Sequence, residues 1–253
     1  MHAEERQHSM LELLRDEGGL TVQKLAAELA VSAETVRRDL RLLEHHGLIR
    51  RVHGGAYPVE SPRFETTLAS RTTHNIADKR RIAAAAAELV GDAETVFIDE
   101  GITPQLIAEA LPTDRPLTVI TAALPTAARL ASVASMTVIL LGGRVRGRTL
   151  ATVDHWAITM LAGLVIDLAY IGANGISRQH GLTTPDPAVA GVKTQAIRSS
   201  RRRIFAGIHT KFGVSSFCRF GDFRDMDVII TDVGLPVAEA RRYITSGPQV
   251  LRV

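Results

Sequence analysis

Arginine side chains are concentrated in residues 31–55, VSAETVRRDLRLLEHHGLIRRVHGG, and guanidinium groups bind phosphates and guanine edges. At 100° per residue, Val36, Leu40 and Leu43 share one face of a helix and the arginines lie opposite. Such a helix can lie in a DNA major groove, although a solvated amphipathic helix would show the same pattern. The residues predicted to contact DNA are Thr21, Ser32, Glu34, Thr35, Arg37, Arg38, Arg41, Arg50, Arg51 and His53.

Three predicted helices and a basic β-segment position these side chains. Glu5–Glu17 is predicted to form the first helix, which ends at a glycine pair. Thr21 is expected to cap a second helix and Ser32 a third, because an N-cap oxygen accepts a hydrogen bond from the first turn. A tight basic hairpin is expected directly after the third helix; in it Leu48–His53 can form a β-strand with two arginines, and a second glycine pair breaks that strand. This order predicts a helix-turn-helix followed by a wing.

Charge in the first 58 residues is patterned rather than uniform. Eight Lys and Arg residues stand against nine Asp and Glu residues, so this segment is not basic overall. The acids cluster in the first helix and at Glu28, away from the arginine-rich face. The formal charge of +3 for the whole chain is compatible with DNA binding and does not require it.

From residue 76 onward, predicted helices alternate with short β-branched strands, which is typical of a parallel α/β sheet. Strands are expected at 95–99, 117–121, 136–141, 168–171, 203–206 and 228–231, and helices at 79–90, 104–111 and 125–132. Such sheets bind ligands at the carboxyl ends of their strands, where glycines admit a ligand and helix N-termini hold anions. The predicted ligand-binding residues there are Asp99, Gly101, Thr103, Thr121, Gly142, Gly143 and Asn174.

The run VSAETVRRDLRLLEHHGLIRRVHGGA resembles the N-terminal signature of DeoR-type bacterial transcriptional regulators. The resemblance implies a winged helix-turn-helix domain at 1–57, a linker at 58–75 and an effector-sensing and oligomerisation domain at 76–253. The domain at 76–253 would be a Rossmann-like parallel α/β domain, similar in fold to ribose-phosphate isomerases and coenzyme A transferases. A homo-oligomeric repressor of carbohydrate-metabolism genes is implied, which binds double-stranded operator DNA. A phosphorylated sugar or related small anionic metabolite would relieve the repression, and the resemblance adds Lys211 to the residues predicted to bind it.

Five positions depart from the usual pattern of that family. Ile102 and Ala122 stand where a threonine and an asparagine are usual, and Val189 and Ile208 replace a glutamate and an aspartate. Asp154 stands where a glycine is common. A polar sugar would lose hydrogen-bond partners at such positions. The departures predict that the effector differs from the usual sugar phosphate, or that ligand sensing is weakened.

An isomerase-like enzyme with an accessory helix-turn-helix is the alternative function. Isomerisation needs a general base, for which Asp99, Glu100 and Lys211 are the candidates. The missing aspartate at Ile208 argues against intact acid–base machinery, so the chain is predicted not to be an enzyme. Neither a cofactor nor a metal is expected, and the single cysteine, Cys218, excludes an internal disulfide.

The remaining conspicuous residues are given structural interpretations. Arg198 and 201–203 are predicted to be the solvated end of a helix that begins near Ala188. Trp156 is predicted to be a packing residue, and Cys218 to be partly buried. The N-terminus does not resemble a signal peptide, and no apolar run reaches the roughly 18 residues of a membrane span. The sequence therefore predicts a cytoplasmic protein.

Overall fold

The computed structural model describes residues 3–17, 19–45, 48–52, 54–58 and 75–253. The chain divides into two compact units, Met1–Thr66 and Thr67–Val253. His53, predicted to contact DNA, and residues 59–74, most of the predicted linker, lie outside the described residues. Within the described residues, no helix is both long and apolar enough to span a bilayer.

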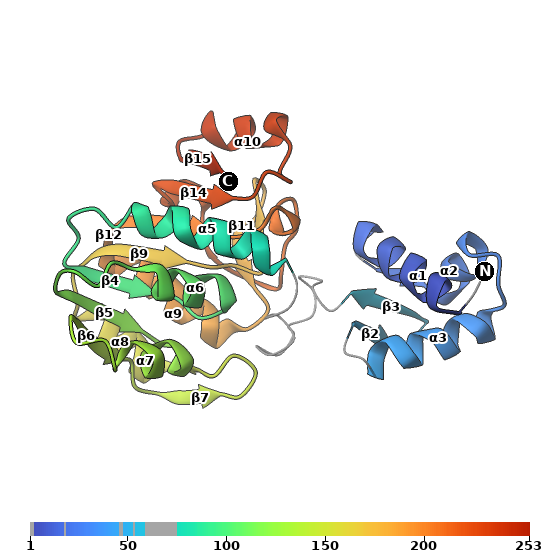
Figure 1. The fold of residues 1–253 in the computed structure, drawn as a ribbon, viewed down its shortest axis with the longest axis horizontal. Helices are drawn as coiled ribbons and strands as arrows, with labels where there is room; N and C mark the ends of the chain where they lie inside the picture. Colours follow the sequence, from blue (N-terminus) through green and yellow to red (C-terminus); the bar gives the residue numbers. More distant parts are fainter. Residues whose placement is uncertain (1–2, 18, 46–47, 53, 59–74) are drawn as a thin grey trace. The chain divides into compact units, whose positions relative to one another are not determined.

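The N-terminal unit contains three helices and a small antiparallel sheet (Figure 1). The helices are α1 (Ala3–Glu17), α2 (Val22–Glu28) and α3 (Ala33–His45), and the strands are β1 (Leu20–Thr21), β2 (Ile49–Val52) and β3 (Gly55–Pro58). The Thr21 side chain accepts a hydrogen bond from the Lys24 backbone N–H at 3.2 Å. The Ser32 hydroxyl accepts one from the Thr35 N–H at 3.1 Å. Both predicted caps are confirmed.

The predicted buried face of α3 is confirmed as well. Val36, Leu40 and Leu43 are at most 2% exposed, and they pack with Met10 of α1 and Leu25 of α2 in one apolar cluster. The predicted basic hairpin after α3 is confirmed, since β2 and β3 pair on either side of the glycine pair at 54–55. The sequence pattern indicates only the first of its strands; β3 lies between β1 and β2.

A seven-stranded sheet forms the centre of the larger unit, and all its neighbouring strands are parallel. Its strand order is β15-β14-β12-β9-β4-β5-β6. The strands are β4 (Thr95–Ile98), β5 (Leu117–Thr121), β6 (Met136–Leu140), β9 (Ile166–Ile171), β12 (Ser200–Ala206), β14 (Val228–Thr231) and β15 (Gln249–Arg252). The fold class predicted from the sequence is therefore correct, and β15 is a strand that the sequence pattern did not reveal.

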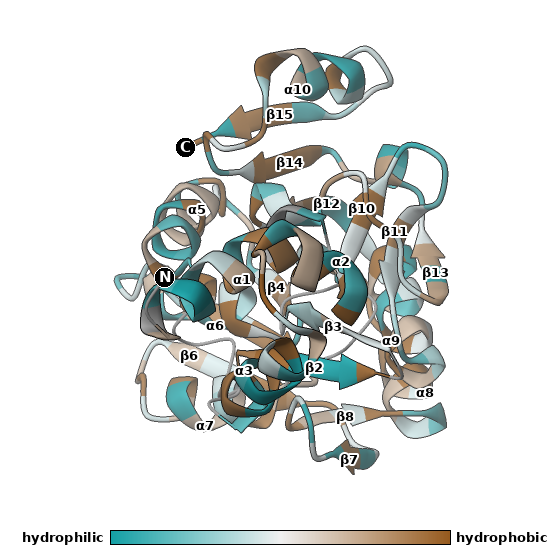
Figure 2. Ribbon diagram, turned by 90° about the vertical axis from the view of Figure 1, so that its right-hand side faces the viewer, coloured by the Kyte–Doolittle hydropathy of each residue, from teal (hydrophilic) through white to brown (hydrophobic). Residues whose placement is uncertain are grey.

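Helices cover both faces of this sheet (Figures 1 and 2). One apolar cluster joins the sheet to α5 (Ile76–Glu88), α6 (Ile102–Ala110) and α7 (Leu124–Leu130). The other joins the opposite face to α8 (His155–Ala162), α9 (Pro187–Ser199) and α10 (Val237–Ile244). The sheet interior is apolar because both faces are buried, whereas β2 of the other unit is coloured hydrophilic in Figure 2.

Smaller sheets extend the larger unit beyond its carboxyl edge. The strands β7 (Arg144–Arg146) and β8 (Ala151–Val153) form a hairpin after β6. The strands β10 (Gly175–Ser177), β11 (Gly181–Thr184) and β13 (Cys218–Gly221) form an antiparallel sheet after β9. None of these short strands was predicted, because three or four residues carry too little periodicity.

Two structural predictions are wrong. Arg201–Arg203 belong to β12 and not to a helix end, because α9 stops at Ser199 and the next residues pair with β9. There, Arg201 binds Asp167 at 3.2 Å and Arg202 donates to the Leu89 carbonyl at 2.9 Å. Trp156 is 69% exposed on α8 and is not a packing residue. Cys218 is partly buried, as predicted.

Candidate nucleic-acid interface and ligand site

The outer face of α3 carries a small network of charged side chains. Glu34 accepts hydrogen bonds from Arg37 and from Arg41, each at 3.2 Å. All three side chains are more than half exposed, so water screens these pairs and they add little stability. Arg38 lies on the same helix and forms no hydrogen bond or ion pair with a described residue. This face therefore offers guanidinium groups that an anionic partner can recruit at low cost.

The inner side of α3 is held by a buried carboxylate that the sequence reasoning missed. Asp39 is 2% exposed and accepts hydrogen bonds from the Arg6 Nε at 2.6 Å and the Gln7 Nε2 at 3.1 Å, both on α1. Burial raises the pKa of the Asp39 carboxyl, but the hydrogen bonds from Arg6 and Gln7 outweigh it and lower the pKa below its ordinary value. Asp39 therefore fixes α3 against α1. The sequence does carry a signal for this burial: Asp39 lies three residues after Val36 and four before Leu43, and so on the buried face of α3.

The β2–β3 hairpin is tied to α3 by another ion pair. Glu44 accepts hydrogen bonds from the Arg51 Nε at 2.7 Å and from the Arg51 backbone N–H at 3.1 Å. The hydrogen bond from Arg51 also lowers the pKa of Glu44. Arg50, on the same strand, is exposed. A β-carbon on Gly55 would lie 2.4 Å from the Leu20 carbonyl oxygen, so only glycine lets β1 approach the hairpin this closely.

A cleft of about 600 Å³ separates α2, α3 and the hairpin. Arg37 and Arg51 both line it, from the helix and from the hairpin. The cleft thus combines basic side chains from two elements, as a groove that follows a phosphate backbone does.

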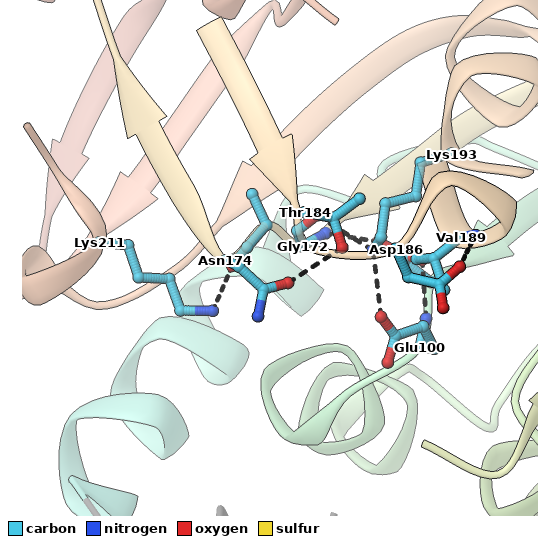
Figure 3. Close-up of polar contacts among 10 residues, drawn as sticks. Glu100, Gly172, Asn174, Thr184, Asp186, Val189, Lys193 and Lys211 are labelled. Atoms are coloured by element: carbon cyan, nitrogen blue, oxygen red, sulfur yellow. Dashed lines mark hydrogen bonds and ion pairs between the residues drawn. The ribbon is translucent and has the colours of Figure 1, made fainter. Parts of the chain in front are cut away.

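The second candidate site lies at the carboxyl edge of the parallel sheet, where Asp99 and Glu100 follow β4; Figure 3 shows Glu100 and its neighbours. Asp99 is 1% exposed and accepts hydrogen bonds from the backbone N–H groups of Glu100 and Gly172, each at 2.8 Å. It also accepts one from the ammonium group of Lys193, which extends from α9. These internal bonds give Asp99 a positioning role: it joins the ends of β4 and β9 to α9.

Lys193 is the central cation of this edge. Its Nζ lies 3.5 Å from the Glu100 Oε1 and donates to the Gly172 carbonyl oxygen at 3.2 Å. Burial lowers the pKa of Lys193, but the carboxylates of Asp99 and Glu100 outweigh it, so the pKa lies above its ordinary value. The side chain is therefore a buried ammonium ion. The sequence reasoning missed it, because its position on a predicted helix gave no sign of the two carboxylates.

Asn174 and Lys211 come together at the end of β9. The Thr184 hydroxyl donates to the Asn174 Oδ1 at 3.2 Å, and the Lys211 ammonium group donates to the Ala173 carbonyl oxygen (Figure 3). Lys211 lies in a short 3-10 helix, His209–Lys211, and is partly buried. The structure thus places two of the sequence-predicted residues at the ends of adjacent strands, β9 and β12.

The first turn of α6 faces the same edge. Gly101 precedes this helix with a φ of 112°, which favours glycine. The N–H groups of Ile102 and Thr103 lie in the first turn, where a helix has no internal acceptor. The Thr103 side chain is buried, and its hydroxyl makes no hydrogen bond within the described residues. Backbone N–H groups and a hydroxyl are the donors that bind phosphate at a helix start.

Thr121, Gly142 and Gly143 lie on the other side of β4, at the ends of β5 and β6. Thr121 is fully buried and accepts a hydrogen bond from the Ala123 N–H at 3.0 Å. Gly143 has a φ of 138°, and a β-carbon there would lie 2.5 Å from the Val153 carbonyl oxygen. Gly143 thus lets the chain pass close to β8. Unlike Gly101 and Thr103, these three residues do not lie at the start of α6.

Four of the five departures from the family pattern are buried, and Asp154 is partly exposed. Ala122 and Ile208 belong to the two apolar clusters, and Ile102 and Val189 are at most 6% exposed. Asp154 has φ 76° and ψ −167°, a backbone conformation found almost only in glycine. Its carboxylate accepts a hydrogen bond from the Arg144 Nε at 2.7 Å.

No group of three or more His, Cys, Asp or Glu side chains within the described parts of the chain is arranged to hold a metal ion. The fold is that of a winged helix-turn-helix joined to a parallel α/β domain, an architecture of transcriptional regulators that sense small molecules.

Comparison with known proteins identifies the family. The model of the DeoR-like helix-turn-helix domain matches residues 6–61, and that of the DeoR C terminal sensor domain matches residues 74–233. The chain belongs to the DeoR family of transcriptional regulators and is a regulator rather than an enzyme.

Two relatives are similar along nearly their whole length. The HTH-type transcriptional regulator GlpR of Haloferax volcanii is 35% identical, over 96% of this chain and 94% of its own. The glycerol-3-phosphate regulon repressor of Escherichia coli (strain K12) is 30% identical, over 94% of each chain. Among solved structures, ribose 5 phosphate isomerase A from Neisseria gonorrhoeae matches with a TM-score of 0.40 and 16% identity, over 54% of this chain and 53% of that one.

Proposed function

We propose that this protein is a repressor that binds double-stranded operator DNA through α3 and the β2–β3 hairpin. Arg38, which has no partner among the described residues, reads a base edge in the major groove. Thr21, Ser32, Glu34, Thr35, Arg37 and Arg41 complete the predicted helix contacts, and Arg50, Arg51 and His53 contact the backbone or the minor groove. The observation that carries this proposal is the exposed arginine face of α3, anchored from behind by the buried Asp39–Arg6 pair.

The effector is proposed to be a phosphorylated sugar or polyol that binds at the carboxyl edge of the parallel sheet. Its phosphate is held by the first turn of α6, with Gly101 and Thr103, and Lys211 supplies a cation on the other side of β9. The name of a relative, the glycerol-3-phosphate regulon repressor, supports this class of compound. Asp99 has a positioning role, and Thr121, Gly142 and Gly143 remain predicted contacts.

Domains are proposed at 1–57 for DNA binding and at 76–253 for effector sensing and oligomerisation, with a linker at 58–75. Two copies would bind the two half-sites of an operator that controls genes of carbohydrate metabolism. The protein would act in the cytoplasm. Effector binding would favour a form whose paired α3 helices no longer match the operator spacing. Because this coupling is reciprocal, operator DNA would weaken effector binding by the same factor.

Selection of DNA fragments by the purified protein, followed by footprinting, tests the DNA-binding proposal. Arg38→Ala is expected to weaken binding to the selected site by about 1–3 kcal/mol while leaving random DNA almost unchanged. Arg198→Ala removes an exposed arginine of α9 and serves as the control. An equal loss on selected and random DNA would show that Arg38 contacts only phosphate.

Release of the selected DNA by phosphorylated compounds tests the effector proposal. We expect a sugar phosphate or polyol phosphate to lower the fraction of bound DNA, and Thr103→Val to abolish the response without affecting DNA binding itself. If no phosphorylated compound releases the DNA, this class of effector is excluded.

A further inference from the structure

Five large apolar side chains are exposed at one end of the larger unit. They lie within residues 140–160, on β6, on the β7–β8 hairpin and on α8, which Figures 1 and 2 show at the end of the sheet opposite β15 and α10. The five residues are between 41% and 69% exposed, and they are Leu140, Val145, Leu150, Trp156 and Met160. Together they define the β6–α8 surface.

Hydrogen bonds fix these elements relative to one another. The N–H of Gly142, two residues after β6, donates to the Met160 Sδ at 3.1 Å, so α8 contacts the end of β6. Trp156 lies one helical turn before Met160 and therefore on the same face of α8. The hairpin is held to the end of β5 by the Thr152 N–H, which donates to the Ala122 carbonyl oxygen at 2.8 Å. A surface that is fixed in advance loses little conformational freedom when a partner docks on it.

The backbone of Leu150 indicates that its exposed side chain has a role outside the unit. Its φ is 52°, in the left-handed region that a branched side chain seldom adopts. Glycine or asparagine at this turn would avoid the strain. Strained residues of this kind are concentrated at functional sites. Because Leu150 is 42% exposed, packing within the larger unit does not account for it.

The apolar area of the β6–α8 surface is sufficient for the core of a dimer interface. An aromatic side chain has roughly 150–250 Å² of surface and an aliphatic one somewhat less, so the exposed fractions leave on the order of 400 Å². In a standard interface each partner buries about 800 Å², of which somewhat more than half is apolar. Tryptophan and methionine are also enriched in such interfaces, and this surface contains one of each.

The charges beside this surface favour a second copy of the chain as its partner. Arg144 pairs with Asp154 at 2.7 Å, and Arg146 pairs with Asp186 at 2.8 Å, so carboxylates of the same chain balance both arginines. The rim therefore carries both signs of charge. Such a rim can face its own copy across a two-fold axis with opposite charges adjacent, whereas it offers no excess charge to DNA or to an acidic protein.

Open strand edges border the same surface. β6 ends the seven-stranded sheet and β7 ends the two-stranded one, and within the described residues neither has a strand on its outer side. Natural proteins cover or pair such edges. A two-fold axis can place an edge antiparallel to its own copy, so a second copy of this chain satisfies this requirement as well.

We infer that the β6–α8 surface is a two-fold interface between two copies of this chain, in which Trp156, Met160 and Val145 become buried. The inference rests on the proposed function, in which two copies bind two half-sites, and it names the surface that joins them.

Sedimentation equilibrium and fluorescence of the full chain, at the same series of concentrations, test this inference. Trp156 is the only tryptophan of the sequence, so its emission reports whether this surface is in water or covered. We expect the mass to rise from one copy to two and the emission maximum to move to shorter wavelength over the same range. Constant emission while the mass doubles would place the interface elsewhere; this inference would be refuted, and the pairing of two copies would stand.

Val145→Glu and Val237→Glu are matched variants. The two valines are 47% and 52% exposed, and Val237 lies on α10, at the other end of the sheet. Val145→Glu is expected to raise the dissociation constant of the pair at least about tenfold and to move the emission to longer wavelength, because it brings carboxylates into an apolar contact. Val237→Glu should change the constant by less than about threefold. Equal weakening by both variants, or none by Val145→Glu, would refute this surface.

Two outcomes concern a protein that remains a single copy at every concentration. If its emission is that of an exposed indole, both the inference and the pairing of two copies in the proposed function are overturned. If its emission lies at short wavelength, another part of the same chain covers the β6–α8 surface, and the inference is refuted.

Discussion

Replacing Asp154 with glycine is expected to stabilise the larger unit. Asp154 has φ 76° and ψ −167° at the start of α8, and its side chain forms no capping hydrogen bond there. A β-carbon in this region of backbone space costs about 1–3 kcal/mol, a cost that glycine does not have. The family pattern, in which glycine is common at this position, thus has a conformational reason.

Two effects offset part of this gain. The Arg144–Asp154 pair is lost, but the side chains are 62% and 39% exposed, so solvent already weakens that pair. Glycine also has more freedom in the unfolded chain, which costs about 0.5–1 kcal/mol. The net expectation for Asp154→Gly is a gain of roughly 1 kcal/mol, or about 2–4 °C in the Tm of a unit of this size.

Differential scanning calorimetry of the full chain measures the effect, and Asp154→Ala separates its causes. Alanine removes the ion pair and keeps the β-carbon, so it should not raise the Tm. If the alanine and glycine variants have the same Tm, backbone strain at this position is not the reason, and the reasoning fails.

Three further outcomes are expected. Arg50→Ala should weaken binding to all DNA sequences and reduce the slope of log K against log salt by about 0.9 per lost phosphate contact; an unchanged slope would exclude a phosphate contact. Because the pKa of Asp39 is lowered in the folded state, its contribution is present above the ordinary value and is lost as pH falls through the folded pKa. Urea denaturation in acid should therefore show a weaker pH dependence for Asp39→Asn than for the native N-terminal unit, and identical curves would argue against the pair with Arg6. Lys193→Met should destabilise the larger unit by about 3–5 kcal/mol, since it removes the ammonium group that binds the buried Asp99 carboxylate, and a change below about 1 kcal/mol in the same assay would refute that role.

The N-terminal unit could be predicted in most respects because its signals are local. Thr21 and Ser32 act within one helical turn of their own positions, and both cap the expected helices. The apolar stripe of α3 follows from the helical period and is buried as expected. The hairpin after α3 was expected, but the place of β3 between β1 and β2 was not, because β1 is remote in sequence and only the fold pairs it with β3.

The larger unit was predictable as alternating helices and strands, yet its site was only partly so. That Asp99 and Asn174 would lie at one edge of the sheet was predictable, because parallel strands bring their carboxyl ends to the same edge. Lys193 was missed, and the arginines of β12 were assigned to a helix. In both cases the deciding contacts are remote in sequence: Lys193 binds a residue 94 positions away, and Arg202 donates to one 113 positions away.

The sequence by itself determined the two-part architecture, the orientation of α3 and the family of this regulator, because helical period, capping and motif spacing are properties of neighbouring residues. Tertiary structure alone decided which charged side chains are buried and paired across the fold. Asp39 and Asp99 are buried and bound by donors from other elements, and Lys193 of α9 faces the carboxylates at the end of β4. The physical reason is that a side chain's charge is set by its type, but its availability depends on the donors that the fold brings to it.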